Sequence, residues 1–334
     1  SADVSVLKKA DTTDEMLSKI DIVSTNTLKE CMQTFFEDGP KRDRRLWIGD
    51  LRLEALTNYY TFNNLEIVRR CLYLFAAGDC NALGFLPSFV YDTPYYHSGE
   101  TFIEDYVLLY VVTVCDYYEH TGDDEVLCDL LPLCKSQLDS FRATLDENLI
   151  TTKQNGWFAF IDWCPGLEIL TALQGVYLYT LDRFAGLLEK IGDEDYKKYS
   201  YLLEEVRGSC KKHLYNEKKK IFVNDADNNQ LSVHSQVWMI LGGAVDGEDA
   251  KEILLKTLAD ENAKQPCTPY MHHYVIEAMM KLGMKNEAVL YLKKYWGGMI
   301  ELGADTFWEA YIPDEPDFSP YNDRMINSLC HAWS

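Results

Sequence analysis

The sequence DGPKRDRRLWIGD, at residues 38–50, is unlike a core segment. A helix cannot comfortably continue through Gly39-Pro40, and the residues that follow combine carboxylates, guanidinium groups and one indole. If these residues are helical, their spacing places three carboxylates and an aromatic ring on one face: Asp43, Trp47, Asp50 and Glu54. Such a face is typical of a sugar site, where carboxylates bind hydroxyls and a ring covers the apolar side of a pyranose. The alternative is a solvated, salt-bridged helix start in which Trp47 fills the core.

Length and charge set the broad class of the protein. A chain of 334 residues is long enough for a large core, and its formal net charge is -21. This charge repels polyanions, so we expect neither nucleic acid nor an anionic membrane as a partner. The sequence contains no 18-residue uncharged apolar run, and residues 1–4 do not begin a signal region. It does not determine the oligomeric state.

Cysteine and histidine spacing argues against disulfide and metal frameworks. The ten cysteines are scattered, without a C-x-x-C pair, and several, such as Cys71, lie in apolar helical patterns. We therefore expect a reducing, cytoplasmic setting. His272 and His273 are adjacent, so on a helix their rings point about 100° apart, and no H-E-x-x-H motif occurs. We predict no metal and no cofactor.

Hydrophobic periodicity predicts an almost entirely helical chain. Residues 1–13 are polar and expected to be flexible. Apolar residues then recur at spacings of three and four, and predict helices at 14–38, 49–61, 63–79, 101–121, 124–145, 167–191, 193–215, 230–242, 248–259, 268–282 and 284–298. A last apolar segment starts near Tyr321. Two loops rich in helix breakers, 80–100 and 303–323, are long enough to be functional.

About a dozen helices in antiparallel pairs predict an all-α fold. Six hairpins closing on themselves form an (α/α)6 barrel, a six-hairpin toroid, with the long loops crowded at one end. Because no polar low-complexity stretch divides the chain, we predict one domain over residues 14–334. A superhelical repeat array is the alternative, but the sequence has no fixed repeat period.

Four separated stretches resemble motifs of the bacterial α-L-rhamnosidases, glycoside hydrolase family 78. Residues 38–50 resemble the acid-bearing motif of that family, and residues 303–309 (GADTFWE) resemble its Thr-x-Trp-Glu motif. Residues 327–333 (NSLCHAW) are similar to its Ser-Leu-x-His segment, and Asp162-Trp163 looks like its Asp-Trp dipeptide. The resemblance extends from about Asp14 to the end of the chain. It implies an (α/α)6 barrel that removes terminal α-L-rhamnose with inversion.

The resemblance also implies roles for individual residues. It makes Asp43, seven residues before Asp50, the general acid and Glu309 the general base. Asp38 and Asp50 match carboxylates that hold rhamnose hydroxyls. The predicted substrate-binding set is completed by Trp47, Asp162, Trp163, Trp308 and His331. Inverting hydrolysis requires the acid and base to lie about 6.5–9.5 Å apart, with room for a water between them.

Two features depart from the family pattern. The acid is usually a glutamate, and Asp43 is one methylene shorter. Arginines at positions 42, 44 and 45 flank it, and nearby cations lower a carboxyl pKa. The acid role therefore requires these arginines to point away or Asp38 and Asp50 to offset them, and either of these aspartates is the alternative acid. Family members also usually carry β-sandwich domains before and after the barrel, so the chain is a minimal form or a piece of a longer protein.

Two other functions fit the same residues. The first is a non-catalytic carbohydrate-binding homologue, because the shorter Asp43 stands where glutamate is usual. The second is another toroid glycosidase, such as an unsaturated uronyl hydrolase, because the arginines of residues 42–45 are suited to binding a substrate carboxylate.

Overall fold

Helices make up most of the computed structural model, which describes residues 3–152, 158–224 and 230–334. The described helices in the first half of the chain are α1 (Glu15–Cys31), α2 (Ile48–Tyr60), α3 (Leu65–Ala76), α4 (Glu104–Thr121) and α5 (Asp124–Arg142). Those in the second half are α6 (Leu170–Ile191), α7 (Tyr196–His213), α8 (Val233–Leu241), α9 (Gly247–Leu258), α10 (Pro269–Lys281) and α11 (Lys285–Glu301).

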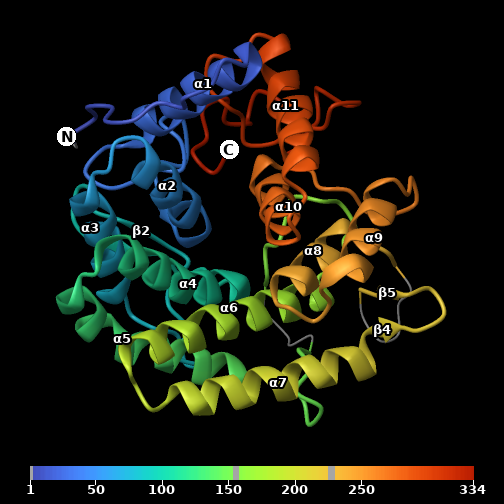
Figure 1. Cartoon of the computed structure of the whole chain (residues 1–334). Helices are drawn as coiled ribbons and strands as arrows, with labels where there is room; N and C mark the ends of the chain where they lie inside the picture. The colour runs from blue at the N-terminus through green and yellow to red at the C-terminus, as the bar shows by residue number, and fades with distance from the viewer. Residues whose placement is uncertain (1–2, 153–157, 225–229) are drawn as a thin grey trace.

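These helices form a ring of inner and outer members (Figure 1). Along the inside, α2 contacts α4, α4 contacts α6, α6 contacts α8, and α8 contacts α10. The other helices lie outside and pack on a sequence neighbour, and α11 also packs on α1, which brings the two ends of the chain together. This arrangement confirms the predicted all-α (α/α)6 barrel. A superhelical array would leave α1 and α11 far apart.

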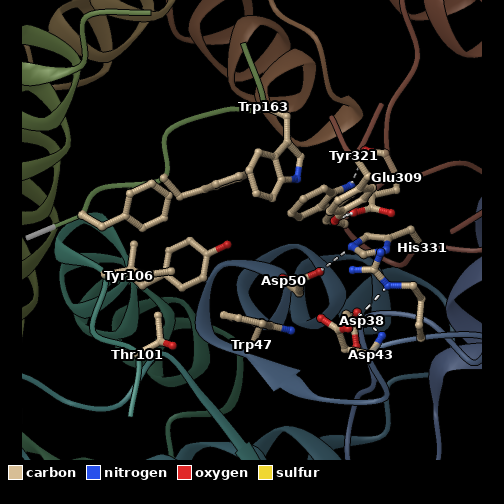
Figure 2. A pocket seen from close by; sticks show the side chains of 15 residues that line it. Asp38, Asp43, Trp47, Asp50, Thr101, Tyr106, Trp163, Glu309, Tyr321 and His331 are labelled. Atoms are coloured by element: carbon tan, nitrogen blue, oxygen red, sulfur yellow. Dashed lines mark hydrogen bonds and ion pairs between the residues drawn. The ribbon is translucent and has the colours of Figure 1, made fainter. Parts of the chain in front are cut away.

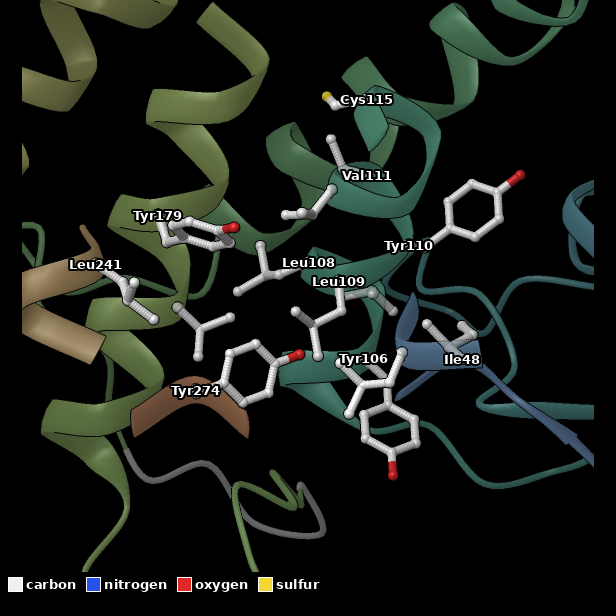
Figure 3. Close-up of a cluster of buried hydrophobic side chains, with 14 of the residues drawn as sticks. Ile48, Tyr106, Leu108, Leu109, Tyr110, Val111, Cys115, Tyr179, Leu241 and Tyr274 are labelled. Atoms are coloured by element: carbon white, nitrogen blue, oxygen red, sulfur yellow. The ribbon is translucent and has the colours of Figure 1, made fainter. Parts of the chain in front are cut away.

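The inner helices are buried on nearly all sides. In α4 every residue from Glu104 to Tyr117 is buried, and in α8 every residue is buried. A helix that is apolar all round requires neighbours on every face, which only the inner position provides. Figure 3 shows Leu108 and Leu109 of α4 directed toward Tyr179 of α6 and Tyr274 of α10.

Local signals in the sequence set several helix boundaries. Asp14 begins α1, because its side chain accepts hydrogen bonds from the amides of Met16 and Leu17. Ser232 and Thr268 cap α8 and α10 in the same way. Asn64 and Asp123 cap α3 and α5, which follow α2 and α4 after short connections.

The key stretch, residues 38–50, is a loop and a strand up to Trp47, and the helix predicted at 49–61 begins at Ile48. Asp43 and Trp47 therefore do not share a helix face with Asp50 and Glu54, so the condition set for the helical face is not met. The reason is Asp38, whose carboxylate accepts hydrogen bonds from the amides of Asp43 (3.0 Å) and Arg45 (2.8 Å). These bonds fold the segment into a loop, because amides bound to a side chain are not available to a helix.

A small sheet extends this loop. Strand β1 (Leu46–Trp47) pairs antiparallel with β2 (Phe89–Tyr91), with Trp47 opposite Phe89. Strand β3 (His97–Ser98) lies on the other side of β2. The region 80–100, predicted to lack regular structure, thus supplies two strands that support the key stretch. A second hairpin joins β4 (Tyr215–Asn216) to β5 (Ile221–Phe222).

The two ends of the chain are irregular in the described residues. Residues 3–13 form no helix or strand, although the amides of Leu7 and Lys8 bond to the carbonyl of Thr61. The flexibility of residues 1–13, of which 1 and 2 lie outside the described range, stays a prediction, as does the domain boundary at residue 14. The segment after Tyr321 is not helical either. Within the described ranges, no helix has the length and apolar character needed to cross a bilayer.

Candidate active site

A cavity of about 140 Å³ opens at the end of the barrel where the long loops meet (Figure 2). Its walls come from the key stretch, the start of α4, residues 158–163 and the C-terminal segment. The structure brings seven of the nine predicted site residues to it: Asp38, Asp43, Trp47, Asp50, Trp163, Glu309 and His331. Residues that are up to 293 positions apart in the sequence therefore meet at one site (331 − 38 = 293).

Asp38 is a buried carboxylate at the floor of the key loop. Burial raises the pKa of its carboxyl to about 6; the positive charge of His331 opposes this rise and the charge of Asp50 adds to it. Its two oxygens accept the amides of Asp43 and Arg45. Asp38 therefore shapes the loop that carries the predicted acid, besides lining the cavity.

Asp50 and His331 form a buried ion pair in the cavity wall. Nε2 of His331 lies 3.0 Å from Oδ1 of Asp50, and the two side chains are 5% and 2% exposed. Burial alone would lower the pKa of His331, but the hydrogen bond and charge of Asp50, together with the charges of Glu309 and Asp38, raise it to about 9. His331 is therefore a cation at neutral pH, surrounded by carboxylates.

Asp43 lies between two arginines at the cavity mouth. Nε of Arg42 is 3.4 Å from one carboxylate oxygen, and a terminal nitrogen of Arg45 is 3.7 Å from the other. These two arginines do not point away, whereas Arg44 donates to the carbonyl of Pro40 instead. The Asp43 side chain is 27% exposed, so water screens both contacts.

Glu309 is held at both carboxylate oxygens. The hydroxyl of Tyr321 donates to Oε1 at 2.5 Å, and the amide of Ser328 donates to Oε2 at 2.9 Å. The indole of Trp333 donates to the backbone carbonyl of Glu309 at 3.0 Å. The predicted base is thus buried and oriented by donors from the C-terminal segment.

Aromatic rings form two walls of the cavity. Trp47, on strand β1, packs on Phe89 of β2 with 4.5 Å between ring centroids. Trp163 lies against Phe160 at 5.1 Å. The Nε1 atom of Trp163 is buried and has no hydrogen-bond partner among the described residues.

Two predicted site residues do not line the cavity. The side chain of Asp162 is fully buried and binds Nε2 of His234 (2.7 Å), the amide of Cys267 (2.8 Å) and the hydroxyl of Thr268 (2.6 Å). These hydrogen bonds connect the segment that carries Trp163 to α8 and to the start of α10. Trp308 packs with Tyr311 in a separate apolar cluster.

Glu54 also lies outside the cavity. A helix through the key stretch would have placed it on the same face as Asp43, Trp47 and Asp50. Glu54 is fully buried, and neither carboxylate oxygen has a partner in the described part of the chain. Burial and the charges of Asp50 and Asp38 raise its pKa well above the usual range. Glu54 therefore lies in the core, where its surroundings favour the neutral form of its carboxyl.

Several lining residues were not predicted from the sequence: Arg42, Thr101, Ile103, Tyr106, Phe158, Phe160, Tyr321 and Trp333. Thr101 directly follows one of the two loops singled out as functional, and Tyr321 lies in the other. The length of these loops and their helix-breaking residues predicted that they are functional. They did not predict which side chains of the loops face the cavity. Over the described residues, no group of three or more His, Cys, Asp or Glu side chains has a geometry suited to a metal ion.

The family model of the bacterial alpha-L-rhamnosidase six-hairpin glycosidase domain matches residues 7–334. The chain belongs to this family. The match spans all four motif stretches and confirms the family predicted from them.

Solved rhamnosidase structures have the same fold. A rhamnosidase from Klebsiella oxytoca with rhamnose bound is 38% identical, with a TM-score of 0.94 over 99% of this chain and 64% of that one. A GH78 family rhamnosidase from Bacillus sp. GL1 is 23% identical, with a TM-score of 0.83 over 99% of this chain and 35% of that one. A Streptomyces avermitilis alpha-L-rhamnosidase complexed with L-rhamnose is 18% identical, with a TM-score of 0.73 over 98% of this chain and 31% of that one.

The chain thus spans less than two thirds of the length of each of these family members. No match was found among curated proteins.

Proposed function

We propose that this chain is the catalytic domain of an inverting α-L-rhamnosidase that removes terminal α-L-rhamnose from glycosides or oligosaccharides. The observation that carries the proposal is the meeting of Asp43 and Glu309, from opposite ends of the chain, in one cavity with aromatic walls. Membership of the rhamnosidase family and the likeness to a rhamnose-bound relative support the choice of sugar.

In the proposed reaction Asp43 is the general acid and Glu309 the general base. The carboxyl proton of Asp43 passes to the glycosidic oxygen as the bond from that oxygen to C1 breaks. Glu309 takes a proton from a water that attacks C1 on the opposite face, so the configuration at C1 inverts. The donors from Tyr321 and Ser328 aim the Glu309 carboxylate, because they fix both of its oxygens.

The other lining residues bind the sugar in this proposal. Asp38 and Asp50 accept hydrogen bonds from rhamnose hydroxyls, and the cation of His331 keeps the nearby carboxylates from repelling one another. Trp47 and Trp163 cover apolar parts of the ring and its methyl group. The free Nε1 of Trp163 donates to a hydroxyl. Asp162 and Trp308, predicted as substrate ligands, support the site from outside the cavity.

Asp38 is the second candidate for the acid. Burial raises its pKa to about 6, as a general acid requires, whereas Asp43 lies half-exposed beside Arg42 and Arg45. Against Asp38, both of its oxygens already accept backbone amides, and these bonds favour the carboxylate. Exposure of Asp43 at the cavity mouth gives it direct access to a leaving group.

The test is hydrolysis of 4-nitrophenyl α-L-rhamnoside by the wild type, Asp43→Asn, Asp38→Asn and Glu309→Gln. The variant that lacks the general acid loses turnover on rhamnosides with poor leaving groups, such as alkyl alcohols. It keeps far more turnover on 2,4-dinitrophenyl rhamnoside, whose leaving group needs no protonation. Glu309→Gln loses turnover on both. Proton NMR of the first-formed sugar reports inversion directly, and release of α-rhamnose would contradict the mechanism.

Two outcomes would favour the other functions. A wild type that binds rhamnose without turning over any rhamnoside would be a carbohydrate-binding homologue. Turnover of an unsaturated uronide would indicate a uronyl hydrolase. Arg42, the arginine that lines the cavity, already contacts Asp43 and Tyr321, so a substrate carboxylate would have to displace these contacts.

A reducing, cytoplasmic setting is part of the proposal. All ten cysteines are free thiols, and six of them are buried: Cys31, Cys71, Cys115, Cys134, Cys210 and Cys267. Thiol quantification on protein purified without reductant tests this assignment.

A further inference from the structure

Tyr321, which no motif pointed to, makes the most direct contact with the proposed base. Its hydroxyl lies 2.5 Å from Oε1 of Glu309. Burial, together with the charge of Glu309, raises the pKa of Tyr321, so the hydroxyl keeps its proton and acts as the donor. The short contact therefore fixes one carboxylate oxygen in direction as well as in position.

The ring of Tyr321 is itself held on two sides. The guanidinium carbon of Arg42 lies 4.4 Å from the ring centroid, within the range of a cation–π contact. Trp163 meets the same ring edge-on, with 5.8 Å between centroids. All three side chains line the cavity, and Figure 2 shows Tyr321 beside Glu309. A ring packed in this way has little freedom to carry its hydroxyl away from the base.

The backbone that carries Tyr321 is tied to the loop of the proposed acid. The hydroxyl of Ser319 accepts the amide of Tyr321 and donates to the side chain of Asn327 at 2.7 Å. Nζ of Lys41 donates to the carbonyls of Met325 (2.6 Å) and Asn327 (3.2 Å). Hydrogen bonds therefore join the two loops on either side of the cavity mouth.

We propose that Tyr321, held by Arg42, is a positioning residue that aims Glu309 at the attacking water and sets its separation from Asp43. The inference rests on the proposed function. Arg42 also lies 3.4 Å from Asp43, so a continuous chain of contacts runs from Asp43 through Arg42 and Tyr321 to Glu309. Inversion depends on a separation of about 6.5–9.5 Å between the two carboxyl groups, and this chain of contacts joins the residues that carry them.

The test begins with Tyr321→Phe, which removes the donor and keeps the ring. We expect kcat on 4-nitrophenyl α-L-rhamnoside to fall roughly 10- to 100-fold with little change in KM, because water activation is impaired and sugar binding is not. The fall should be equal for good and poor leaving groups, since proton donation by the acid is intact. Arg42→Lys, which keeps the charge and loses the planar stack, should give a smaller fall.

Azide distinguishes a misplaced base from general damage. It attacks C1 without losing a proton, so it should restore turnover in Tyr321→Phe, as in Glu309→Gln. A C1–N bond forms as the glycosidic bond breaks, the leaving oxygen takes the proton of the acid, and the product is the β-rhamnosyl azide. A structural defect in Tyr321→Phe would show no rescue.

Tyr73→Phe is the matched control. It removes a comparable hydroxyl–carboxylate bond, 2.6 Å to Asp129, on the surface away from the cavity, and should leave kcat unchanged. Wild-type kcat in Tyr321→Phe, or a loss that azide does not rescue, would overturn the inference while the proposed function stands. A wild type inactive on every rhamnoside would overturn both.

Discussion

His331 lies 3.0 Å from Asp50, at the point where the C-terminal segment crosses the start of α2. This contact brings a buried cation among the carboxylates of Asp38, Asp50 and Glu309, all of which line the same cavity. Without it three acidic groups would share a space nearly closed to solvent. The pair is therefore both an element of the fold and a determinant of the charge in the site.

The Asp50–His331 pair predicts a loss of stability at alkaline pH. The pKa of His331 is about 9 in the folded chain, against an ordinary histidine value of 6.5, so its contribution is fully present below pH 6.5 and is lost as pH rises through 9. We expect the free energy of unfolding of the wild type, relative to His331→Gln, to fall by on the order of 3 kcal/mol over this range. Urea unfolding at pH 6, 7.5 and 9.5 measures it.

Asp38 titrates close to the lowest of these pH values, because its pKa is about 6 and depends on the charge of His331, so the comparison of pH 7.5 with pH 9.5 reports His331 with the least contribution from Asp38. A difference between wild type and His331→Gln that is the same at pH 6 and pH 9.5 would show that His331 does not carry a proton at neutral pH.

Trp163→Phe tests the free indole nitrogen. The substitution keeps an aromatic ring against Phe160 and removes the Nε1 donor, which has no partner among the described residues. We expect the dissociation constant for rhamnose to rise about fivefold to tenfold, the cost of one hydrogen bond, without a change in the free energy of unfolding. Isothermal titration calorimetry measures it. Trp308→Phe, outside the cavity, is the control, and equal effects of the two would refute the assignment.

Asp162→Asn should lower the free energy of unfolding more than it impairs rhamnose binding or hydrolysis. The carboxylate accepts hydrogen bonds from three groups, and an amide nitrogen in place of one oxygen cannot accept from the amide of Cys267 or from Thr268. We expect a loss of about 2–3 kcal/mol in the free energy of unfolding, as for a buried charged acceptor. Denaturant unfolding checks this. A stable variant with weakened rhamnose binding would instead restore Asp162 as a direct ligand.

Arg52 predicts a second large stability effect, inside the ring. It is 3% exposed and binds Asp116 of α4 (3.0 Å), Glu277 of α10 (3.1 Å) and the hydroxyl of Tyr179 of α6 (2.8 Å). Arg52→Met removes the buried cation that Asp116 and Glu277 share, although Asp116 keeps Arg183, and should cost about 3 kcal/mol.

The control for Arg52→Met is Arg70→Ala, which breaks a half-exposed pair with Asp92 and should cost about 1 kcal/mol or less. Urea unfolding of both variants decides the comparison. Similar losses would mean that the network does not hold the inner helices together.

Helix positions were predictable because their causes are local. Apolar residues at spacings of three and four, and capping side chains such as Asp14, act within a few residues of one another. Residues 38–47 do not form a helix, because Asp38 accepts hydrogen bonds from the amides of Asp43 and Arg45. These bonds form only when the loop is folded.

Residue types and their order in the chain determined the family, the all-α barrel and seven of the fifteen residues that line the cavity. Only the tertiary structure decided that Asp162 is hydrogen-bonded to His234, Cys267 and Thr268, that Glu54 is buried, and that Arg42 and Tyr321 connect the acid loop to the base. The physical reason is distance along the chain. The contacts that set charge and orientation in the site join segments hundreds of residues apart, and their geometry exists only when α1 and α11 close the ring.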